Sequence, residues 1–195
     1  MPTDNQTNLL DALNQRRSTP SRLLGDPGPT EIQLVQILQA AVRVPDHGQL
    51  TPWRFIRIQG DARDALGEAL VARHRQIDAF VNQAALDKDR SRFSYAPLII
   101  TVVGRMYPEH KVPVFEQMHS GACVCFALMQ AAQALGFASQ WLTGWAAYDT
   151  EIEKMLGIER QDRILGFIHI GTAKEAFPER QRPDPMALLS DWSPT

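Results

Sequence analysis

The stretch "APLIITVVGR", residues 96–105, is a continuous run of apolar side chains, many of them β-branched. A strand with a solvated face would alternate apolar and polar residues, so this run predicts a β-strand covered on both faces. "RILGFIHIG", residues 163–171, predicts a second buried strand for the same reason. "RFIRIQ", residues 54–59, predicts a strand with one solvated face, and "ASQWLTGW", residues 138–145, a short extended segment.

Two helices are expected before the strand at 54–59. Residues 7–15 carry leucines at helical spacing. The second helix begins at Thr30, which has the spacing of a capping box with Gln33, and Pro45 stops it. Its apolar stripe is formed by Leu34, Val35, Leu38, Ala41 and Val42.

A long helix is expected after that strand. Asp61 caps it and it runs to about Ala85. Its inward-facing residues are Leu66, Leu70, Ile77, Phe80 and Val81. The next segment, "DKDRSR" at residues 87–92, predicts a polar loop whose charges are solvated.

The segment "SGACVCFALMQAAQALG", residues 120–136, is apolar or small nearly all round and ends at Gly136. A helix without a polar face should be buried on every side, which suggests a central helix or one completed by a second subunit. Cys123 and Cys125 point in divergent directions on such a helix and cannot form a disulfide with each other. We expect both to be small buried residues.

The end of the chain combines a small helix with an irregular segment. Asp149 or Thr150 caps a helix over residues 151–156, which Gly157 closes. Residues 172–195 are rich in proline and charge but retain large apolar side chains. This composition predicts an arm that docks on another surface rather than a free tail.

Composition narrows the classes of function. The 195 residues are enough for one domain with a sizeable core, and we expect residues 1–195 to form it. Hydrophobic residues make up 44% and charged residues 22%, which is typical of a soluble globular protein. The net charge of −2 favours neither nucleic acid nor a membrane surface as partner. The N-terminal residues lack the pattern of a signal peptide, and no apolar run is long enough to span a membrane, so we expect a cytoplasmic protein.

Common catalytic motifs are missing from the sequence. It contains no G-x-G-x-x-G after a strand, no P-loop and no G-x-S-x-G elbow. The five histidines do not have the spacing of metal ligands, so no metal is expected. If the protein is a redox enzyme, a cofactor would therefore supply its chemistry.

Arg16, Arg17 and Ser18 form the most cationic segment near the N-terminus. Two guanidinium groups beside a hydroxyl suit a phosphate or a polarised carbonyl. The alternative is a basic turn that complements the dipole of the preceding helix. Context comes from two later segments, the proline-rich "VRVPDHGQLTPW" at 42–53 and "QWLTGW" at 140–145.

In this order, these segments resemble the nitroreductase family of flavin enzymes, most closely its short bacterial branch. The likeness covers residues 9–184 and rests on "RRS" (16–18), "RVPDHGQLTPWRF" (43–55), "APLIITVV" (96–103), "HKVPVFEQMHSGA" (110–122), "QWLTG" (140–144) and "ILGFIHIGT" (164–172). It implies an α+β fold with a central, mostly antiparallel sheet flanked by helices. It further implies an intertwined homodimer with two FMN molecules at the interface, on which the arm at 172–195 docks.

The resemblance also implies roles for individual residues. Arg16, Arg17 and Ser18 of one chain would contact the phosphate and the ring edge of FMN. Trp141, Leu142 and Thr143 would lie against the isoalloxazine ring. The partner chain would add contacts from Arg43 and His47. The segment expected to approach the nicotinamide nucleotide consists of Ala131, Ala132, Gln133, Ala134, Leu135 and Gly136.

Structural roles compete with several of these assignments. His47 could instead be a hydrogen-bonded structural residue, and Arg43 could be a cation that complements the dipole at a helix end. Trp53 is expected in the core. Lys111 and Glu116 either line the substrate opening or form a surface pair.

Two departures from the larger nitroreductases stand out. Gln49 stands where Asn is common, and Thr51 where Gln is common, so the polar edge of the flavin would be contacted differently. The expected Lys/Arg phosphate pair is missing from the C-terminal arm, where Lys174, Arg180 and Arg182 are the available substitutes.

The resemblance implies a ping-pong oxidoreductase that passes hydride from NADH or NADPH through FMN to a nitroaromatic or quinone-like acceptor. Flavin N5 would carry the chemistry, so no catalytic side chain is expected. Two alternatives remain open. One is a flavin-dependent dehydrogenase or oxidase that acts on an organic substrate, and the other is a flavin-binding module without turnover.

Overall fold

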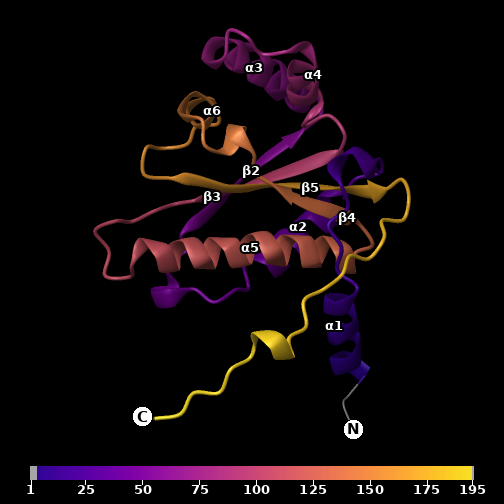
Figure 1. Ribbon diagram of the computed structural model, residues 1–195, viewed down its shortest axis with the longest axis vertical. Coiled ribbons are helices and arrows are strands. Elements are labelled where there is room, and N and C mark those ends of the chain that lie inside the picture. The colour runs from indigo at the N-terminus through magenta and orange to yellow at the C-terminus, as the bar shows by residue number, and fades with distance from the viewer. Residues whose placement is uncertain (1–3, 195) are drawn as a thin grey trace.

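The protein forms a five-stranded antiparallel sheet with helices on both faces (Figure 1). The computed structural model describes residues 4–194, with side chains from residue 9 onward. The helices are α1 (Asp4–Asn14), α2 (Glu31–Ala41), α3 (Asp61–Ile77), α4 (Gln83–Ser91), α5 (Val114–Ala134) and α6 (Thr150–Met155). The strands are β1 (Leu24–Gly25), β2 (Trp53–Gln59), β3 (Leu98–Gly104), β4 (Ala138–Leu142) and β5 (Arg163–Ala173).

Strand β5 is the centre of the sheet. It pairs with β3 along one edge, where Leu98 lies opposite Ile170, and with β4 and β1 along the other. Strand β2 extends the sheet beyond β3. All of these pairings are antiparallel, which confirms the expected α+β architecture.

Alternate side chains of β3 enter two different cores. Leu98, Ile100 and Val102 pack with residues of α2 and α5 on one face of the sheet. Ile99 and Val103 pack on the opposite face with residues of α3 and α6. Every residue of β3 is buried, so the expectation of a strand covered on both faces is confirmed.

Several expected helix ends are also confirmed. Thr30 and Gln33 form the capping box of α2, with the Gln33 amide 3.3 Å from Thr30 Oγ1. Asp149 caps α6 by accepting from the Glu151 and Ile152 amides. Gly136 follows α5 with a φ of +85°, the conformation expected just beyond a helix end.

The prediction of a single long helix from Asp61 to about Ala85 is wrong. Gly60 is the N-cap, α3 ends at Ile77, and a separate helix begins at Gln83. The break has a local cause, because Asp78 Oδ1 accepts from the Phe80 amide and Asn82 Oδ1 from the Ala85 amide. Such side chains offer the backbone an alternative to continuing a helix. Phe80, expected inside, is 96% exposed, and Ile77 is half exposed.

The polar loop expected at residues 87–92 is helical up to Ser91. Its charges are not all solvated either, because Asp89 is 2% exposed and contacts His74, Arg92 and Trp145. The polar sequence did not indicate a helix here, because its charged residues pair with other side chains only in the folded protein.

Two other predicted faces need correction. In α2 the buried residues are Leu34, Ile37 and Ala41, whereas Val35 and Val42 are exposed. Strand β2 has no single solvated face, since Phe55 packs in one core and Ile56 and Ile58 in the other. Trp53 lies in the core as expected.

Helix α5 is buried only on the side that faces the sheet and α2. On its outer side Phe115, Met118 and Phe126 are between 41% and 59% exposed, so the prediction that the helix is buried on every side is wrong for the single chain. Cys125 is buried, and burial raises its pKa to about 12. Cys123 is exposed, contrary to expectation.

Both ends of the chain present apolar side chains to the outside. Leu9 and Leu10 of α1 are more than 60% exposed. The C-terminal segment leaves β5, passes near α1 and runs away from the sheet (Figure 1). Met186, Leu188 and Trp192 on this segment are all at least 68% exposed.

Two absences hold for the described residues. None of their helices has the length and apolar character that crossing a bilayer requires. Within the same part of the chain, no cluster of three or more His, Cys, Asp or Glu side chains is placed to bind a metal.

His169 is a polar side chain at the centre of the sheet. It is fully buried and stacks on Phe93, with the ring centroids 5.6 Å apart. Among the described residues, no hydrogen-bond partner reaches either ring nitrogen. Burial, assisted by the charge of Arg92, lowers the pKa of His169 to about 4. The ring is therefore neutral near pH 7.

Acid is expected to destabilise the fold through His169. Its pKa is about 6.5 in an unfolded chain and about 4 here, so the unfolded state binds more protons in between. The free energy of unfolding should fall as the pH drops from about 6.5 to 4, by roughly 3 kcal/mol at most. In urea unfolding at pH 7 and pH 5, His169→Phe should flatten this slope. The exposed His119 supplies the control, His119→Gln, which should not, and equal slopes in all three proteins would contradict the prediction.

Candidate functional site

Two cavities adjoin at the β4 edge of the sheet and share Pro20 and Gln140 in their walls. The first, the cationic cavity, has a volume of about 270 Å³ and is lined by Arg16, Arg17, Ser18, Pro20, Gln140, Phe177, Pro178, Arg180 and Arg182. The second, the edge cavity, has a volume of about 720 Å³ and is lined by Pro20, Ser21, Arg22, Asp87, Lys88, Ser91, Arg92, Tyr95, Gln140, Trp141, Leu142, Thr143 and Gly144. The shared residues place the two cavities next to each other.

The cationic cavity joins two distant parts of the chain. Arg16 and Arg17 follow the end of α1, and the segment after β5 brings Arg182 beside them. Arg182 Nη2 donates to the Arg16 carbonyl at 3.2 Å. Glu179 forms ion pairs with both Arg17 and Arg182. The start of the C-terminal segment is therefore fastened to the segment after α1.

Positive charge dominates this cavity. Four arginines line it, whereas one carboxylate, that of Glu179, pairs with them. Partial burial and the charges of Arg182, Arg180 and Arg17 lower the pKa of Arg16, which shows how closely the cations are grouped. The Arg16 guanidinium also donates to Ser18 Oγ at 3.2 Å. Guanidinium groups and a hydroxyl are the donors that bind a phosphate group.

One wall of the edge cavity is the end of β4. Gln140 Oε1 accepts from the Ser21 amide at 2.5 Å, which holds the segment before β1 against this strand. Trp141 Nε1 donates to the Leu165 carbonyl at 3.0 Å. The indole lies so close to Gly166 that a Cβ there would be 2.0 Å from Trp141 Nε1. The wall is thus a fixed, partly aromatic surface.

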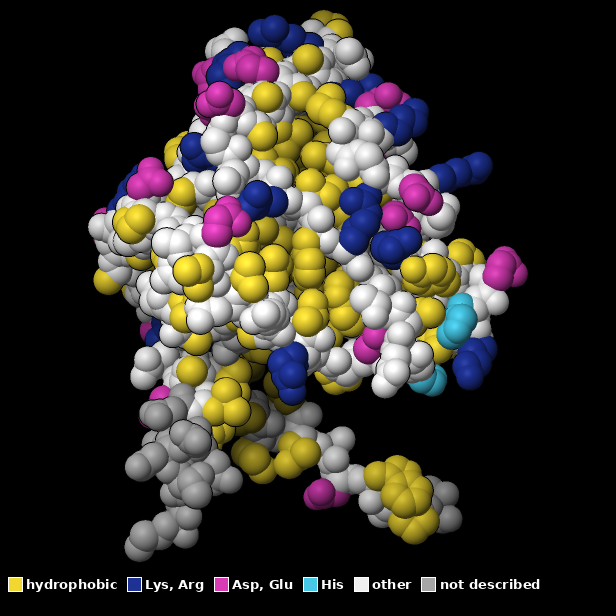
Figure 2. Space-filling view, turned by 180° about the vertical axis from the view of Figure 1, so that it is seen from behind, with side chains coloured by type: hydrophobic (Ala, Val, Ile, Leu, Met, Phe, Trp, Pro, Cys, Tyr) yellow, Lys and Arg dark blue, Asp and Glu magenta, His cyan; other side chains and the backbone are white. Residues whose placement is uncertain are grey.

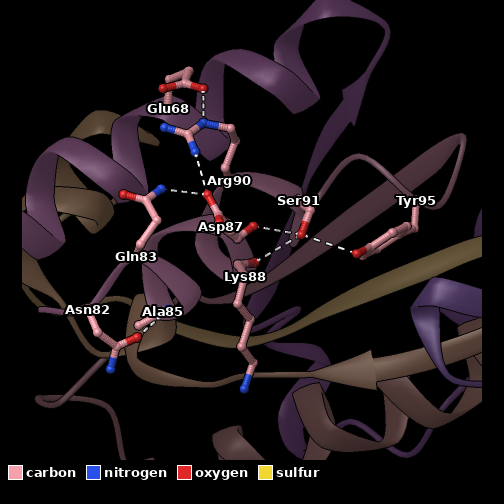
Figure 3. Close-up of polar contacts among 9 residues, drawn as sticks. All are labelled: Glu68, Asn82, Gln83, Ala85, Asp87, Lys88, Arg90, Ser91 and Tyr95. Atoms are coloured by element: carbon pink, nitrogen blue, oxygen red, sulfur yellow. Dashed lines mark hydrogen bonds and ion pairs between the residues drawn. The ribbon is translucent and has the colours of Figure 1, made fainter.

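Helix α4 forms the opposite wall. Asp87, Ser91 and Tyr95 are connected by short contacts: Ser91 Oγ donates to the Asp87 carbonyl at 2.8 Å and Tyr95 Oη to Ser91 Oγ at 3.2 Å (Figure 3). The Lys88 ammonium extends away from these contacts (Figure 3). Arg92 lies just beyond the helix. The edge cavity therefore combines apolar wall area with three cations, Arg22, Lys88 and Arg92.

The structure brings two of the predicted groups together. Arg16, Arg17 and Ser18 line the cationic cavity, and Trp141, Leu142 and Thr143 line the edge cavity beside it. The alternative role for Arg16–Ser18, a basic turn acting on the dipole of α1, does not account for their clustering with arginines of the C-terminal segment.

Arg43 and His47 line neither cavity of their own chain. Arg43 is exposed beyond the end of α2. His47 Nδ1 lies 2.6 Å from Glu116 Oε2, so Glu116 contacts His47 rather than Lys111. We expect Arg43 and His47 to contact the FMN of the partner chain, and this contact stays a prediction.

The loop that carries His47 has a strained backbone. Gln49 and Thr51 have φ values of +54° and +49°, and the Thr51 amide donates to Asp46 Oδ2 at 2.8 Å. A positive φ is costly for a β-branched residue such as threonine. Strain of this kind is found preferentially at functional sites, which supports a binding role for the loop.

The segment Ala131–Gly136 also lines neither of the two cavities. Ala132 is fully buried in the core, and Gln133 Nε2 donates to the Ala12 carbonyl at 3.1 Å. These contacts account for part of the segment as packing between α5, α2 and α1. Its approach to a nicotinamide nucleotide stays a prediction.

Lys88 and Arg92 are cavity residues that the sequence reading missed. Both lie in residues 87–92, for which the sequence predicts a solvated loop. The available signal was the i, i+3 spacing of Asp89 and Arg92, which forms an ion pair once the segment is helical. Arg180 and Arg182, named from sequence as substitutes for a phosphate pair, do line the cationic cavity.

Comparison with known proteins agrees with this fold. The model of the "Nitroreductase family" matches residues 13–172. The chain is 39% identical to "Putative NAD(P)H nitroreductase YdjA" of Escherichia coli K12, over 93% of this chain and 97% of that one. A nitroreductase-like protein of Bacillus cereus has a similar structure, with a TM-score of 0.80 at 22% identity over 97% of both chains. A Desulfovibrio desulfuricans protein described as "a putative nitroreductase in complex with fmn" has a similar structure, with a TM-score of 0.70 at 21% identity over the full length of both chains. The chain therefore belongs to the nitroreductase family.

Proposed function

We propose that the protein is an FMN-dependent oxidoreductase that transfers hydride from NADH or NADPH to electron-poor acceptors such as nitroaromatics or quinones. The observation that carries this proposal is that the cationic cavity adjoins the larger edge cavity, with Pro20 and Gln140 in the walls of both. A strongly positive recess next to an apolar slot with cations at its rim suits a ligand with a phosphate at one end and a flat ring system at the other. FMN has this form.

The residues of the chain fit the parts of FMN by their chemistry. Arg16, Arg17, Ser18, Arg180 and Arg182 would hold the phosphate. Trp141, Leu142 and Thr143 would lie against the ring system. Bound FMN would supply the hydride chemistry, and no side chain need act as a nucleophile. Lys88 and Arg92 would stabilise negative charge at the polar rim of the ring.

We further propose that two chains assemble and that each completes the site of the other. The exposed apolar side chains of α1, α5 and the C-terminal segment would be covered by this contact, which would offset the cost of leaving them in water. In this arrangement Arg43 and His47, on their strained loop, would reach the partner's FMN. The C-terminal segment would dock on the partner chain.

Arg17→Ala is expected to weaken FMN binding by roughly 10- to 100-fold, because a charge-assisted hydrogen bond to phosphate contributes about 1.5–3 kcal/mol. Fluorescence titration of the apoprotein with FMN measures the dissociation constant. Glu179→Gln is the matched control. Glu179 pairs with the same arginine, so its neutralisation should tighten binding rather than weaken it. If both variants bound FMN as the wild type does, the phosphate assignment would be wrong.

Anaerobic addition of NADH or NADPH should bleach the yellow FMN-loaded protein, and a nitroaromatic or a quinone added afterwards should restore the colour. Visible spectroscopy follows both steps. Bleaching by an organic donor but by neither nucleotide would instead identify a dehydrogenase or oxidase. A protein that holds FMN and responds to no donor would be a binding module, and the proposed reaction would be refuted.

The wild-type protein should sediment as a dimer, and Phe126→Glu should shift it toward the monomer. Phe126 is 43% exposed on the outer side of α5, and a charge there would be buried in the proposed contact. Phe80→Glu is the control, because Phe80 is exposed but lies at the break between α3 and α4. Analytical ultracentrifugation distinguishes the species. A monomeric wild type at micromolar concentration would contradict the assembly.

A further inference from the structure

Asp89 differs from the other charged residues of α4. Asp87 and Arg90 lie on the outer side of the helix, where Arg90 pairs with Asp87 and with Glu68 of α3 at the surface (Figure 3). The side chain of Asp89 is 2% exposed instead. Burying a carboxylate is unfavourable unless hydrogen-bond donors surround it, so such donors are expected around Asp89.

Three donors from three parts of the chain converge on this carboxylate. His74 Nδ1 of α3 lies 2.6 Å from Asp89 Oδ2. Trp145 Nε1, from the short helical turn Trp145–Ala147, donates to Oδ1 at 3.1 Å, and Arg92 Nη2 donates to the same oxygen at 3.2 Å. The His74 and Trp145 rings lie 5.3 Å apart. An ionised carboxylate only accepts, so this 2.6 Å contact with an ionised Asp89 requires His74 to donate from Nδ1.

Arg92 extends from this cluster to the edge cavity, which it lines. Its side chain is only 16% exposed. Gly144, at the end of the segment after β4, makes room for it, because a Cβ there would lie 2.5 Å from Arg92 Nη1. Asp89 binds Nη2, and Nε has no partner within the described chain. The guanidinium is thus anchored at one nitrogen, with Nη1 beside the cavity wall.

We propose that Asp89, held by His74 and Trp145, is a positioning residue that orients the Arg92 guanidinium toward the ligand in the edge cavity. This inference rests on the proposed function, in which the ligand is FMN. Asp89 does not itself line the cavity, so it acts through Arg92. Fixing a long side chain before the ligand arrives reduces the conformational entropy that binding would otherwise cost.

A double-mutant cycle tests the inference, with the FMN dissociation constant as readout. Asp89→Asn keeps the shape of the side chain and removes its charge, and it should weaken FMN binding several-fold. Arg92→Met should weaken binding at least as much. In the Arg92→Met background, Asp89→Asn should have no further effect, because residues that act through one contact are not additive.

Two additional variants control for damage to the fold. Glu68→Gln neutralises an exposed carboxylate that also joins α3 to α4, and it should leave the dissociation constant unchanged. If Asp89→Asn does not fold, His74→Phe replaces it. This change keeps a ring beside Trp145 but removes the donor to Asp89, so it should weaken FMN binding only while Arg92 is present.

The outcomes separate this inference from the proposed function. If wild-type protein binds FMN and Arg17→Ala weakens binding, but Asp89→Asn has the same effect with or without Arg92, Asp89 is merely structural and the inference is wrong. No effect of Arg92→Met would also overturn it. If wild-type protein binds no FMN at all, the proposed function fails, and this inference fails with it.

Discussion

The burial of β3 and β5 on both faces is the constraint on which the rest of the structure depends. An antiparallel sheet can leave one face in water, but these two strands carry apolar side chains on both. Helices must therefore cover the sheet twice, α2 and α5 on one face and α3 and α6 on the other. With both faces occupied by packing, the edge of the sheet is where a ligand site can form.

The β4 edge gathers segments that are far apart in the chain. Arg182 contacts Arg16 across 166 positions, and Gln140 contacts Ser21 across 119. Helix α4 closes the other side because the chain breaks after α3 and turns back toward the edge. The resulting site contains cations, hydroxyls and aromatic surface. In the proposed function such a site would bind and orient FMN, and the reactive atoms would come with that cofactor.

Electrostatics divide this site into two parts. In the cationic cavity, grouped arginines outnumber the one carboxylate paired with them, so an anionic group can compensate them. In the edge cavity, Arg92 is balanced by the buried Asp89 and is part of the wall itself. In the proposed function, excess charge would attract the phosphate of FMN in one part, whereas the Asp89–Arg92 ion pair would fix the position of a guanidinium in the other.

The sequence by itself determined the buried strands, the capping box of α2 and the family resemblance, because these depend on local periodicity, on contacts three residues apart or on ordered motifs. For the cap of α6 it left Asp149 and Thr150 as alternatives, and the structure decided for Asp149. Through the family resemblance the sequence also named Arg16–Ser18 and Trp141–Thr143 as candidate binding residues. Only the tertiary structure decided that these two segments line adjoining cavities, that Asp89 is buried, and that the outer side of α5 is exposed. Charge and polarity along a chain do not show whether a side chain meets water or a partner, since that partner can come from any distance in the sequence.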